Sequence, residues 1–290
     1  MSNKRKFWAV LLILFVLGAA GSAGALVYQN IQQRSRLREL EELAQNTVEE
    51  EAPPVIETTM IMPEEPVEEE ESDNAGEPLT LEEKIQWYKD TYDIEVPEKD
   101  LDFADLCANT NPDIYAWIYI PNTKIDYPVL QHPTDNTYYL NYNIDGSKGY
   151  PGCIYTENYN VKDFTDPLTV MYGHNMKNGS MFANLHLFED AEFFEENPYI
   201  FIYLENDVLV YEIFSAGVIN DDHLLYNKDY SNETEMEKYL MDSVTRSSMS
   251  QNVRDDLELT AQDKVLALST CIANRPNNRY LVQGVLLDEN

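Results

Sequence analysis

Short apolar and aromatic runs separated by turn signals fill the chain beyond residue 110, and they constrain the fold more than any other feature. Runs of this length, bounded by Gly, Pro, Asn and Asp, are typical of β-strands. Helical patterns rarely alternate with them, which disfavours a doubly wound parallel sheet. The sequence therefore predicts a mainly β fold, a closed or nearly closed antiparallel barrel of about eight strands. The predicted strands are 114–120, 127–130, 152–155, 168–172, 199–204, 208–216, 265–270 and 280–287.

Helices are predicted at the N-terminal edge and at the periphery of this barrel. Thr80 and Glu83 form a capping-box pattern, which satisfies the unpaired amides at a helix start. Apolar residues then recur at helical spacing up to Tyr92. A short helix near 181–188 and a longer one over 231–248 are also expected.

An uncharged apolar run over residues 7–27 lies far upstream of the predicted strands. Its 21 residues, rising about 1.5 Å each in a helix, could cross the roughly 30 Å hydrocarbon core of a bilayer. The small residues Ala23 and Ala25 leave a cleavable signal peptide as the alternative. Because the run is longer than the apolar region of a typical signal peptide, about 7–15 residues, we expect a retained single-pass anchor in the cell membrane. The basic residues at 4–6 adjoin the run and indicate its orientation. Its N-terminus, residues 1–6, would be cytoplasmic and the rest of the chain extracytoplasmic.

Residues 28–78 are predicted to form a juxtamembrane segment followed by an acidic linker. From 41 to 78 the chain has fourteen Asp or Glu, no Lys or Arg and several prolines, so we expect an extended, disordered spacer. Residues 79–290 are long enough for one globular domain with its own core. The formal net charge of the whole chain is −32, which disfavours binding to nucleic acid because phosphates require a basic surface.

The chain has three cysteines, an odd number for a domain expected outside the cytoplasm. At least one of them must be free or paired between chains. Cys107 lies in an apolar, helix-like setting that favours burial, and the neighbours of Cys153 indicate no partner. The spacing of Cys and His matches no structural zinc site, and no other metal or cofactor is expected.

Two predicted strand ends carry groups capable of chemistry. Cys271 closes the apolar run that begins at Val265, and His174 follows the run 168–172 after one glycine. A thiol with an ordinary pKa of about 8.5 is mostly protonated at neutral pH, so a nucleophilic cysteine needs a nearby cation or base. An imidazole can be either. Taken singly, such a cysteine is more often a core residue and such a histidine a turn residue, but together they favour a catalytic pair.

Arg279 is the third candidate, because it is expected to open the strand that returns beside Cys271. Its fixed fork of donors suits a carbonyl oxygen that becomes an oxyanion. Arg275 competes for this role but lies in a predicted loop rich in Asn and Pro. The remaining histidines, His132, His186 and His223, are predicted to be surface or structural residues.

The strings Tyr172-Gly-His174-Asn-Met176, Leu268-Ser-Thr-Cys271 and Arg279-Tyr-Leu-Val-Gln-Gly284 resemble the sortases of Gram-positive bacteria, and class B most closely. The resemblance covers residues 79–287 and implies a sortase-like closed β-barrel. It implies that His174, Cys271 and Arg279 are catalytic and that Tyr172 and Ser269 line the substrate groove. Ile272 departs from the pattern, since class B members often have an acidic or polar residue after the catalytic cysteine.

The implied reaction is transpeptidation on secreted proteins that carry a C-terminal sorting signal. The thiol would attack the carbonyl of a threonine, form a thioacyl intermediate and pass the acyl group to an amine. The amine would belong to a peptidoglycan precursor or to a pilin, and the residues do not choose between them. A thiol peptidase and an inactive, membrane-tethered binding module with the same fold are the alternatives.

Overall fold

The computed structural model describes residues 79–245 and 251–287, which belong to one compact unit that begins at Asn74. The predicted cytoplasmic segment 1–6, membrane anchor 7–27 and linker 28–78 lie outside the described residues. Among the residues that are described, none of the helices has the length and apolar character needed to span a bilayer. The membrane anchor therefore stays a prediction.

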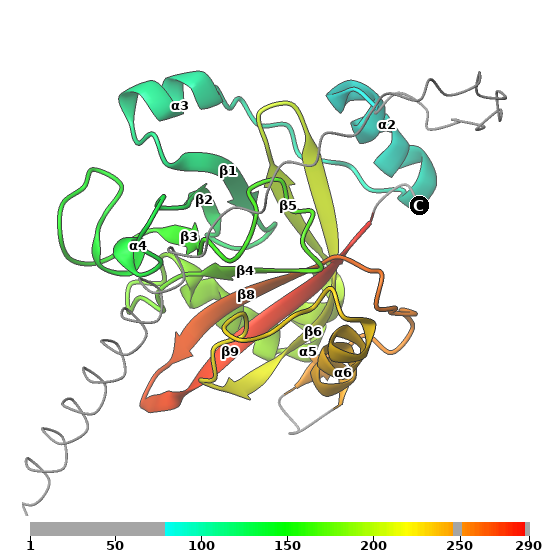
Figure 1. The fold of residues 1–290 in the computed structure, drawn as a ribbon. Helices are drawn as coiled ribbons and strands as arrows, with labels where there is room; N and C mark the ends of the chain where they lie inside the picture. Colours follow the sequence, from blue (N-terminus) through cyan, green and yellow to red (C-terminus); the bar gives the residue numbers. More distant parts are fainter. Residues whose placement is uncertain (1–78, 246–250, 288–290) are drawn as a thin grey trace, which may run out of the picture. The chain divides into compact units, whose positions relative to one another are not determined.

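Within the described residues, eight strands form a closed β-barrel (Figure 1). Their order around the barrel is β5, β1, β2, β3, β4, β8, β9 and β6, and pairing of β5 with β6 closes the ring. This confirms the mainly β, closed-barrel prediction. The strands are β1 (Ile114–Tyr119), β2 (Asp126–Leu130), β3 (Ile154–Thr156), β4 (Leu168–Tyr172), β5 (Tyr199–Tyr203), β6 (Val208–Asn220), β8 (Val265–Ile272) and β9 (Arg275–Leu286).

The expected antiparallel barrel is wrong at two of its strand pairs. β2 runs parallel to β3, and β4 runs parallel to β8 with Leu168 opposite Val265 and Tyr172 opposite Ser269. Parallel neighbours need a long crossover between them, whereas antiparallel neighbours need only a turn. The chain between β4 and β8 provides that crossover, and its described residues contain β5, β6, the short strand β7 (Asn252–Val253) and three helices. Because β4 and β8 point the same way, their C-terminal ends meet at one place.

The apolar run of β8 is buried on two faces, which explains why it lacks strict alternation of apolar and polar residues. Leu266 and Leu268 belong to the core inside the barrel. Val265 and Ala267 instead pack outside the barrel against α6 (Glu233–Val244). Because strand side chains alternate between faces, Cys271 lies on the outer face with Val265 and Ala267.

The hairpin between β8 and β9 is tighter than the sequence indicated. The expected polar loop over 272–278 is reduced to a turn at Ala273 and Asn274, and Asn274 adopts the left-handed conformation with φ 62°. Asn tolerates this conformation better than most residues. β9 consequently begins at Arg275 and includes Pro276, which lies at the irregular end of the ladder, where a missing backbone donor is tolerated.

The sequence prediction missed the strand β7 and the short helices α4 (Tyr138–Asn141) and α5 (Ala191–Glu196), and it ended β6 too early. The two-residue strand β7 (Asn252–Val253) pairs with β6 at Ser215 and Ala216. It is too short for any periodicity to be seen. β6 itself continues to Asn220, beyond the predicted end at 216, and its last residues pair with β9.

Helices cover the ends and sides of the barrel, as Figure 1 shows. The predicted helix near 181–188 is a 3-10 helix, and the predicted helix over 231–248 is described as α6. The 3-10 helix is η1 (Phe182–Glu189), and the remaining helices are α2 (Leu81–Tyr92), α3 (Phe103–Asn109), α4 (Tyr138–Asn141) and α5 (Ala191–Glu196).

The capping box at the start of α2 is present as predicted. The Thr80 amide donates to the Glu83 carboxylate over 2.9 Å, and the Glu83 amide donates to the Thr80 hydroxyl over 3.4 Å. α2 is held to the barrel by Tyr88, which is completely buried. Its hydroxyl donates to the Leu287 carbonyl over 3.0 Å and accepts from the Val210 amide over 3.2 Å.

We expect Tyr88→Phe to lower the free energy of unfolding by about 1–3 kcal/mol, because the change leaves a buried amide and a buried carbonyl without a partner. Denaturant unfolding of the full-length chain measures this. Gln86→Ala, on the exposed side of the same helix, is the control and should change the free energy by less than about 0.5 kcal/mol. Equal effects of the two substitutions would contradict the proposed anchoring of α2.

Candidate active site

Cys271 and Arg279 are direct partners across the β8–β9 ladder. Opposite residues of an antiparallel pair project to the same face, with Cβ atoms about 4.5–5.5 Å apart. Ser269 lies two residues before Cys271 on the same face, and Tyr172 of β4 is opposite Ser269. The outer face of the barrel therefore gathers a thiol, a guanidinium, a hydroxyl and a phenol.

His174 is fixed beside this group because its two neighbours are hydrogen-bonded to the end of β8. The Gly173 amide donates to the Ser269 carbonyl over 3.2 Å, and the Thr270 hydroxyl donates to the Gly173 carbonyl over 2.8 Å. On the other side of the histidine, the side-chain Nδ2 of Asn175 donates to the Cys271 carbonyl over 2.9 Å. These bonds align the histidine with the thiol.

Gly173 is required for this close approach. A Cβ atom at this position would lie 2.5 Å from Ile154 Cδ1 and 2.7 Å from the Phe182 ring. Both neighbours belong to the buried core, so a larger residue would push the loop away from β8.

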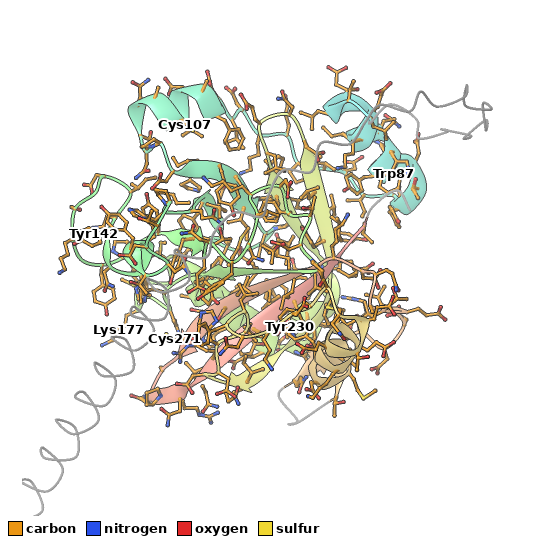
Figure 2. All side chains as sticks on the ribbon, viewed as in Figure 1. Trp87, Cys107, Tyr142, Lys177, Tyr230 and Cys271 are labelled. Carbon is orange, nitrogen blue, oxygen red and sulfur yellow. The ribbon has the colours of Figure 1, made fainter. Side chains whose placement is uncertain are left out.

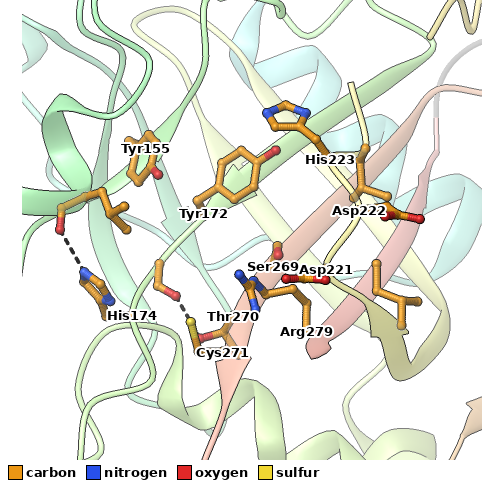
Figure 3. Close-up of a pocket in the computed structure, with 14 residues that line it drawn as sticks. Tyr155, Tyr172, His174, Asp221, Asp222, His223, Ser269, Thr270, Cys271 and Arg279 are labelled. Carbon is orange, nitrogen blue, oxygen red and sulfur yellow. Dashed lines mark hydrogen bonds between the residues drawn. The ribbon is translucent and has the colours of Figure 1, made fainter. Parts of the chain in front are cut away.

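The His174 ring is oriented by the segment that connects β2 to β3. Its Nε2 lies 2.8 Å from the Leu140 carbonyl, and the Tyr150 ring meets it edge-on with ring centroids 4.9 Å apart. A dashed line in Figure 3 marks the hydrogen bond of the His174 ring. Because a carbonyl only accepts, Nε2 carries the proton and Nδ1 is the nitrogen left for another partner.

The Arg279 guanidinium is held by the hairpin that it belongs to. One terminal nitrogen, Nη1, donates to the carbonyls of Pro276 and Asn278, each over 2.9 Å. The competing Arg275 is exposed at the start of β9 opposite Ile272, and it is not part of the pocket wall. The structure thus brings Arg279, and not Arg275, together with Cys271 and His174.

These side chains surround one pocket with a volume of about 330 Å³. Figure 3 shows His174, Cys271 and Arg279 along one side of it and Tyr172 with His223 toward the other. The wall includes all five residues that the sequence singled out, and it also contains residues that sequence reasoning missed. It is formed by Leu140, Tyr155, Tyr172, Gly173, His174, Ile219, Asp221, Asp222, His223, Leu224, Ser269, Thr270, Cys271 and Arg279.

His223 is the clearest of the missed residues, since the sequence placed it among surface or structural histidines. Its Nε2 lies 3.0 Å from the carboxylate of Glu157, a residue that is 7% exposed. This contact joins the segment after β6 to the segment after β3. No sequence signal links residues so far apart, and only the barrel brings them together.

Tyr172 has a buried hydroxyl near this end of the pocket. Among the described residues, none forms a hydrogen bond with the Tyr172 hydroxyl. Burial, and then the nearby Glu157 carboxylate, raise the pKa of Tyr172, so its phenol stays protonated at neutral pH. The hydroxyl is therefore a buried, protonated group beside Glu157.

The other two cysteines lie away from this chemistry, and all three cysteines are free. Figure 2 shows Cys107 on α3, well separated from Cys271 at the end of β8. Cys107 is half-buried and donates to the Ile114 carbonyl over 3.1 Å, so the predicted burial is only partial. Cys153 is buried, and desolvation raises the pKa of its thiol to about 12. Cys271 is the exposed one.

The arrangement can supply a nucleophile, a group that moves a proton and a fork of cationic donors to one bound carbonyl. That set suits acyl transfer through a thioester. Among the described residues, no three His, Cys, Asp or Glu side chains are grouped as metal ligands.

Comparison with known proteins places this fold and site in a family. The model of the sortase domain matches residues 118–287, and the chain therefore belongs to the sortase family. It is a cysteine transpeptidase of the sortase kind. Its relatives below are of class B, as the strings around His174 and Cys271 indicated.

Sortase B of Listeria monocytogenes is 35% identical over 181 residues, which cover 61% of this chain and 71% of the relative. The X-ray structure of Clostridium perfringens sortase B is 32% identical and superposes with a TM-score of 0.57, covering 64% of this chain and 100% of that one. A class B sortase from Streptococcus pyogenes, involved in pilus biogenesis, is 27% identical with a TM-score of 0.55. That match covers 66% of this chain and 100% of the neighbour.

We expect iodoacetamide at pH 8 to label Cys271 and to spare Cys153. A thiol with a pKa of about 12 is deprotonated only above that pH. Roughly one molecule in ten thousand then has a Cys153 thiolate at pH 8, and the thiolate is the reactive form. Peptide mapping of the full-length chain by mass spectrometry measures the labelling. The Cys271→Ala variant controls for assignment, and equal labelling of both cysteines would contradict the prediction.

Proposed function

We propose that the chain is a membrane-anchored transpeptidase that cleaves the C-terminal sorting signal of secreted proteins after a threonine. It then joins the new carboxyl end to an amine of a cell wall precursor. The observation that carries this proposal is the meeting of Cys271, Arg279 and His174 at one pocket on the outer face of a sortase barrel. Each of the three comes from a different segment of the chain.

Cys271 is the proposed nucleophile. The Cys271 thiol gives its proton to His174 Nδ1, and its sulfur attacks the threonine carbonyl carbon to form a carbon–sulfur bond. The carbon–nitrogen bond to the next residue then breaks and leaves the thioester. His174 gives a proton to the departing amine. Since Nε2 is bonded to the Leu140 carbonyl, the proton moves through Nδ1. The segment beyond the threonine leaves.

Arg279 is the proposed stabiliser of the oxyanion. The attacked carbonyl oxygen gains negative charge in the tetrahedral intermediate, and a guanidinium held in advance toward that charge lowers the barrier. The bonds of Arg279 Nη1 to Pro276 and Asn278 hold the fork before substrate arrives. The other guanidinium nitrogens remain for the oxyanion.

An amine completes the proposed reaction. It attacks the thioester carbonyl, gives its proton to His174 and expels the Cys271 thiolate, which restores the free enzyme. Water in place of the amine would give hydrolysis, the outcome of a simple peptidase.

Tyr172 and Ser269 are the proposed contacts to the sorting signal. Both line the pocket on the same face as Cys271, and the Tyr172 hydroxyl is a donor without a partner among the described residues. Ile272 is half-buried and packs against the barrel core, so the position after the nucleophile contributes no polar group.

The proposed location is the extracytoplasmic face of the cell membrane, with residues 7–27 as anchor and 28–78 as a spacer. The support is the uncharged apolar run with its basic N-terminal flank. A tether at the face where secreted proteins emerge raises the effective concentration of enzyme at its substrate.

We expect the full-length chain to convert a threonine-containing sorting peptide into an amide when an amine is supplied. Mass spectrometry of the products, with and without the amine, measures the ratio of transfer to hydrolysis. Cys271→Ala should abolish both products, whereas Cys107→Ala, a free cysteine outside the pocket, should retain them. Cleavage that survives Cys271→Ala would overturn the assignment of the nucleophile.

A pilin-polymerising activity is the second candidate, because one structural neighbour at 27% identity is a class B sortase involved in pilus biogenesis. The same assay separates the two by offering either a peptidoglycan stem or cross-bridge peptide or a lysine-containing pilin peptide. Hydrolysis at an unchanged rate with either amine would favour a thiol peptidase. An intact protein that cleaves no sorting peptide would favour a binding module.

We expect Arg279→Lys to reduce the rate of peptide cleavage by about 100-fold. One ammonium group cannot both keep the hydrogen bonds to the Pro276 and Asn278 carbonyls and reach the oxyanion. The reduction should be in kcat. Arg275→Lys, in the same hairpin but outside the pocket, is the matched control and should retain activity. A near-normal rate for Arg279→Lys would remove the oxyanion role.

A further inference from the structure

The backbone at Cys271 lies where regular strand pairing ends on both sides. The parallel ladder between β4 and β8 stops at Tyr172 and Ser269, two residues before Cys271. On the other side, the β8–β9 register shifts between Cys271 and Ile272. Strand pairing alone therefore leaves the peptide group that follows Cys271 weakly constrained.

Side chains from the loop and helix after β4 take over at this point. Asn175 Nδ2 donates to the Cys271 carbonyl over 2.9 Å, and the same nitrogen lies 2.9 Å from His186 Nε2. His186 Nε2 is itself 3.2 Å from the Cys271 carbonyl. On the far side of the ring, His186 Nδ1 lies 2.6 Å from the Glu189 carboxylate.

With one proton on the His186 ring, these groups allow one consistent set of donors. A carboxylate only accepts, so Glu189 requires a proton on His186 Nδ1. The Nε2 atom of the neutral ring then carries a lone pair, which only the NH₂ side of the Asn175 amide can meet. One amide hydrogen goes to His186 and the other goes to the Cys271 carbonyl. The reversed amide would place its oxygen against two acceptors.

The ring of His186 is itself fixed by packing. It stacks on the Tyr280 ring, with centroids 4.9 Å apart and planes at 30°, and its side chain is 22% exposed. Tyr280 is completely buried and belongs to the core inside the barrel. The helix η1 thus presents His186 from the inner side, opposite the face on which substrate would bind.

We propose that Asn175 is a positioning residue for the Cys271 nucleophile and that His186 and Glu189 fix the orientation of its amide. This inference rests on the proposed role of Cys271. Among the residues described, Asn175, His186 and Glu189 are not part of the pocket wall, so they act through the Cys271 peptide group. Holding that group sets the direction of the thiol relative to His174 and Arg279.

The hydrogen bonds from Glu189 through His186 and Asn175 to the Cys271 carbonyl are called the relay below. Two pairs of substitutions in the full-length chain test it. Asn175→Leu keeps the shape of the side chain without a donor, and Asn178→Leu changes an asparagine of the same loop that bonds only to Ser180. His186→Phe keeps a ring on Tyr280 but has no acceptor, whereas His186→Gln restores an acceptor that can reach Asn175.

We expect Asn175→Leu and His186→Phe to lower kcat for peptide cleavage by about 10- to 100-fold, as small misplacements of reacting groups do, with KM within about threefold of the parent. His186→Gln should recover most of kcat, and Asn178→Leu should match the parent. Rates are normalised to the folded fraction from thermal unfolding. A fall in stability without a fall in kcat would overturn the positioning role, and so would an increase in KM alone.

A second measurement does not need turnover. With ¹³C-carbonyl cysteine, the chain gives signals for Cys107, Cys153 and Cys271, and the relay predicts that Asn175→Leu and His186→Phe move the Cys271 signal alone. An unmoved Cys271 signal would overturn the relay even if the parent cleaves no peptide. A parent that cleaves no peptide while that signal moves would contradict the proposed function and leave the relay standing.

Discussion

Parallel pairing between β4 and β8 is the constraint on which the rest of the site depends. The two strands are far apart in the chain, but they pair in register up to Tyr172, which is opposite Ser269. Each then continues for two residues, to His174 on one side and to Cys271 on the other. Because parallel strands share one direction, groups placed just beyond two neighbouring ends meet without any further adjustment of the backbone.

The nucleophile projects from the outer face of the barrel wall, whereas the side chains that hold its backbone lie on the inner side. Residues of β8 at positions 265, 267, 269 and 271 project outward, and those at 266 and 268 fill the core. Side-chain alternation thus places Cys271 on the outer face without interrupting the packing inside. The η1 helix packs on the inner side, where His186 rests on Tyr280 and reaches the carbonyl of the same cysteine. In the proposed mechanism, substrate therefore approaches Cys271 from the outer face, and His186 reaches its carbonyl from the inner side.

The tight β8–β9 hairpin gives Arg279 its position. The turn at Ala273 and Asn274 pairs Ile272 with Arg275, and a regular ladder would then place Pro276 opposite Cys271. The register shift between Cys271 and Ile272 takes up residues 276–278 of β9, so that Arg279 is opposite Cys271. The bulge after Cys271 absorbs the mismatch between the hairpin end and the regular ladder.

Much of this molecule could be predicted from its sequence, because local patterns carry local structure. Strand runs, the capping box at Thr80 and a thiol and an imidazole at strand ends are features of neighbouring residues, and the strings around His174 and Cys271 indicated the family. The parallel direction of β4 and β8, the partnership of Glu157 with His223 and the contacts of Asn175 and His186 with the Cys271 carbonyl were not predictable. These contacts join residues that are distant in sequence. They form only when the barrel closes, and local sequence patterns do not determine how it closes.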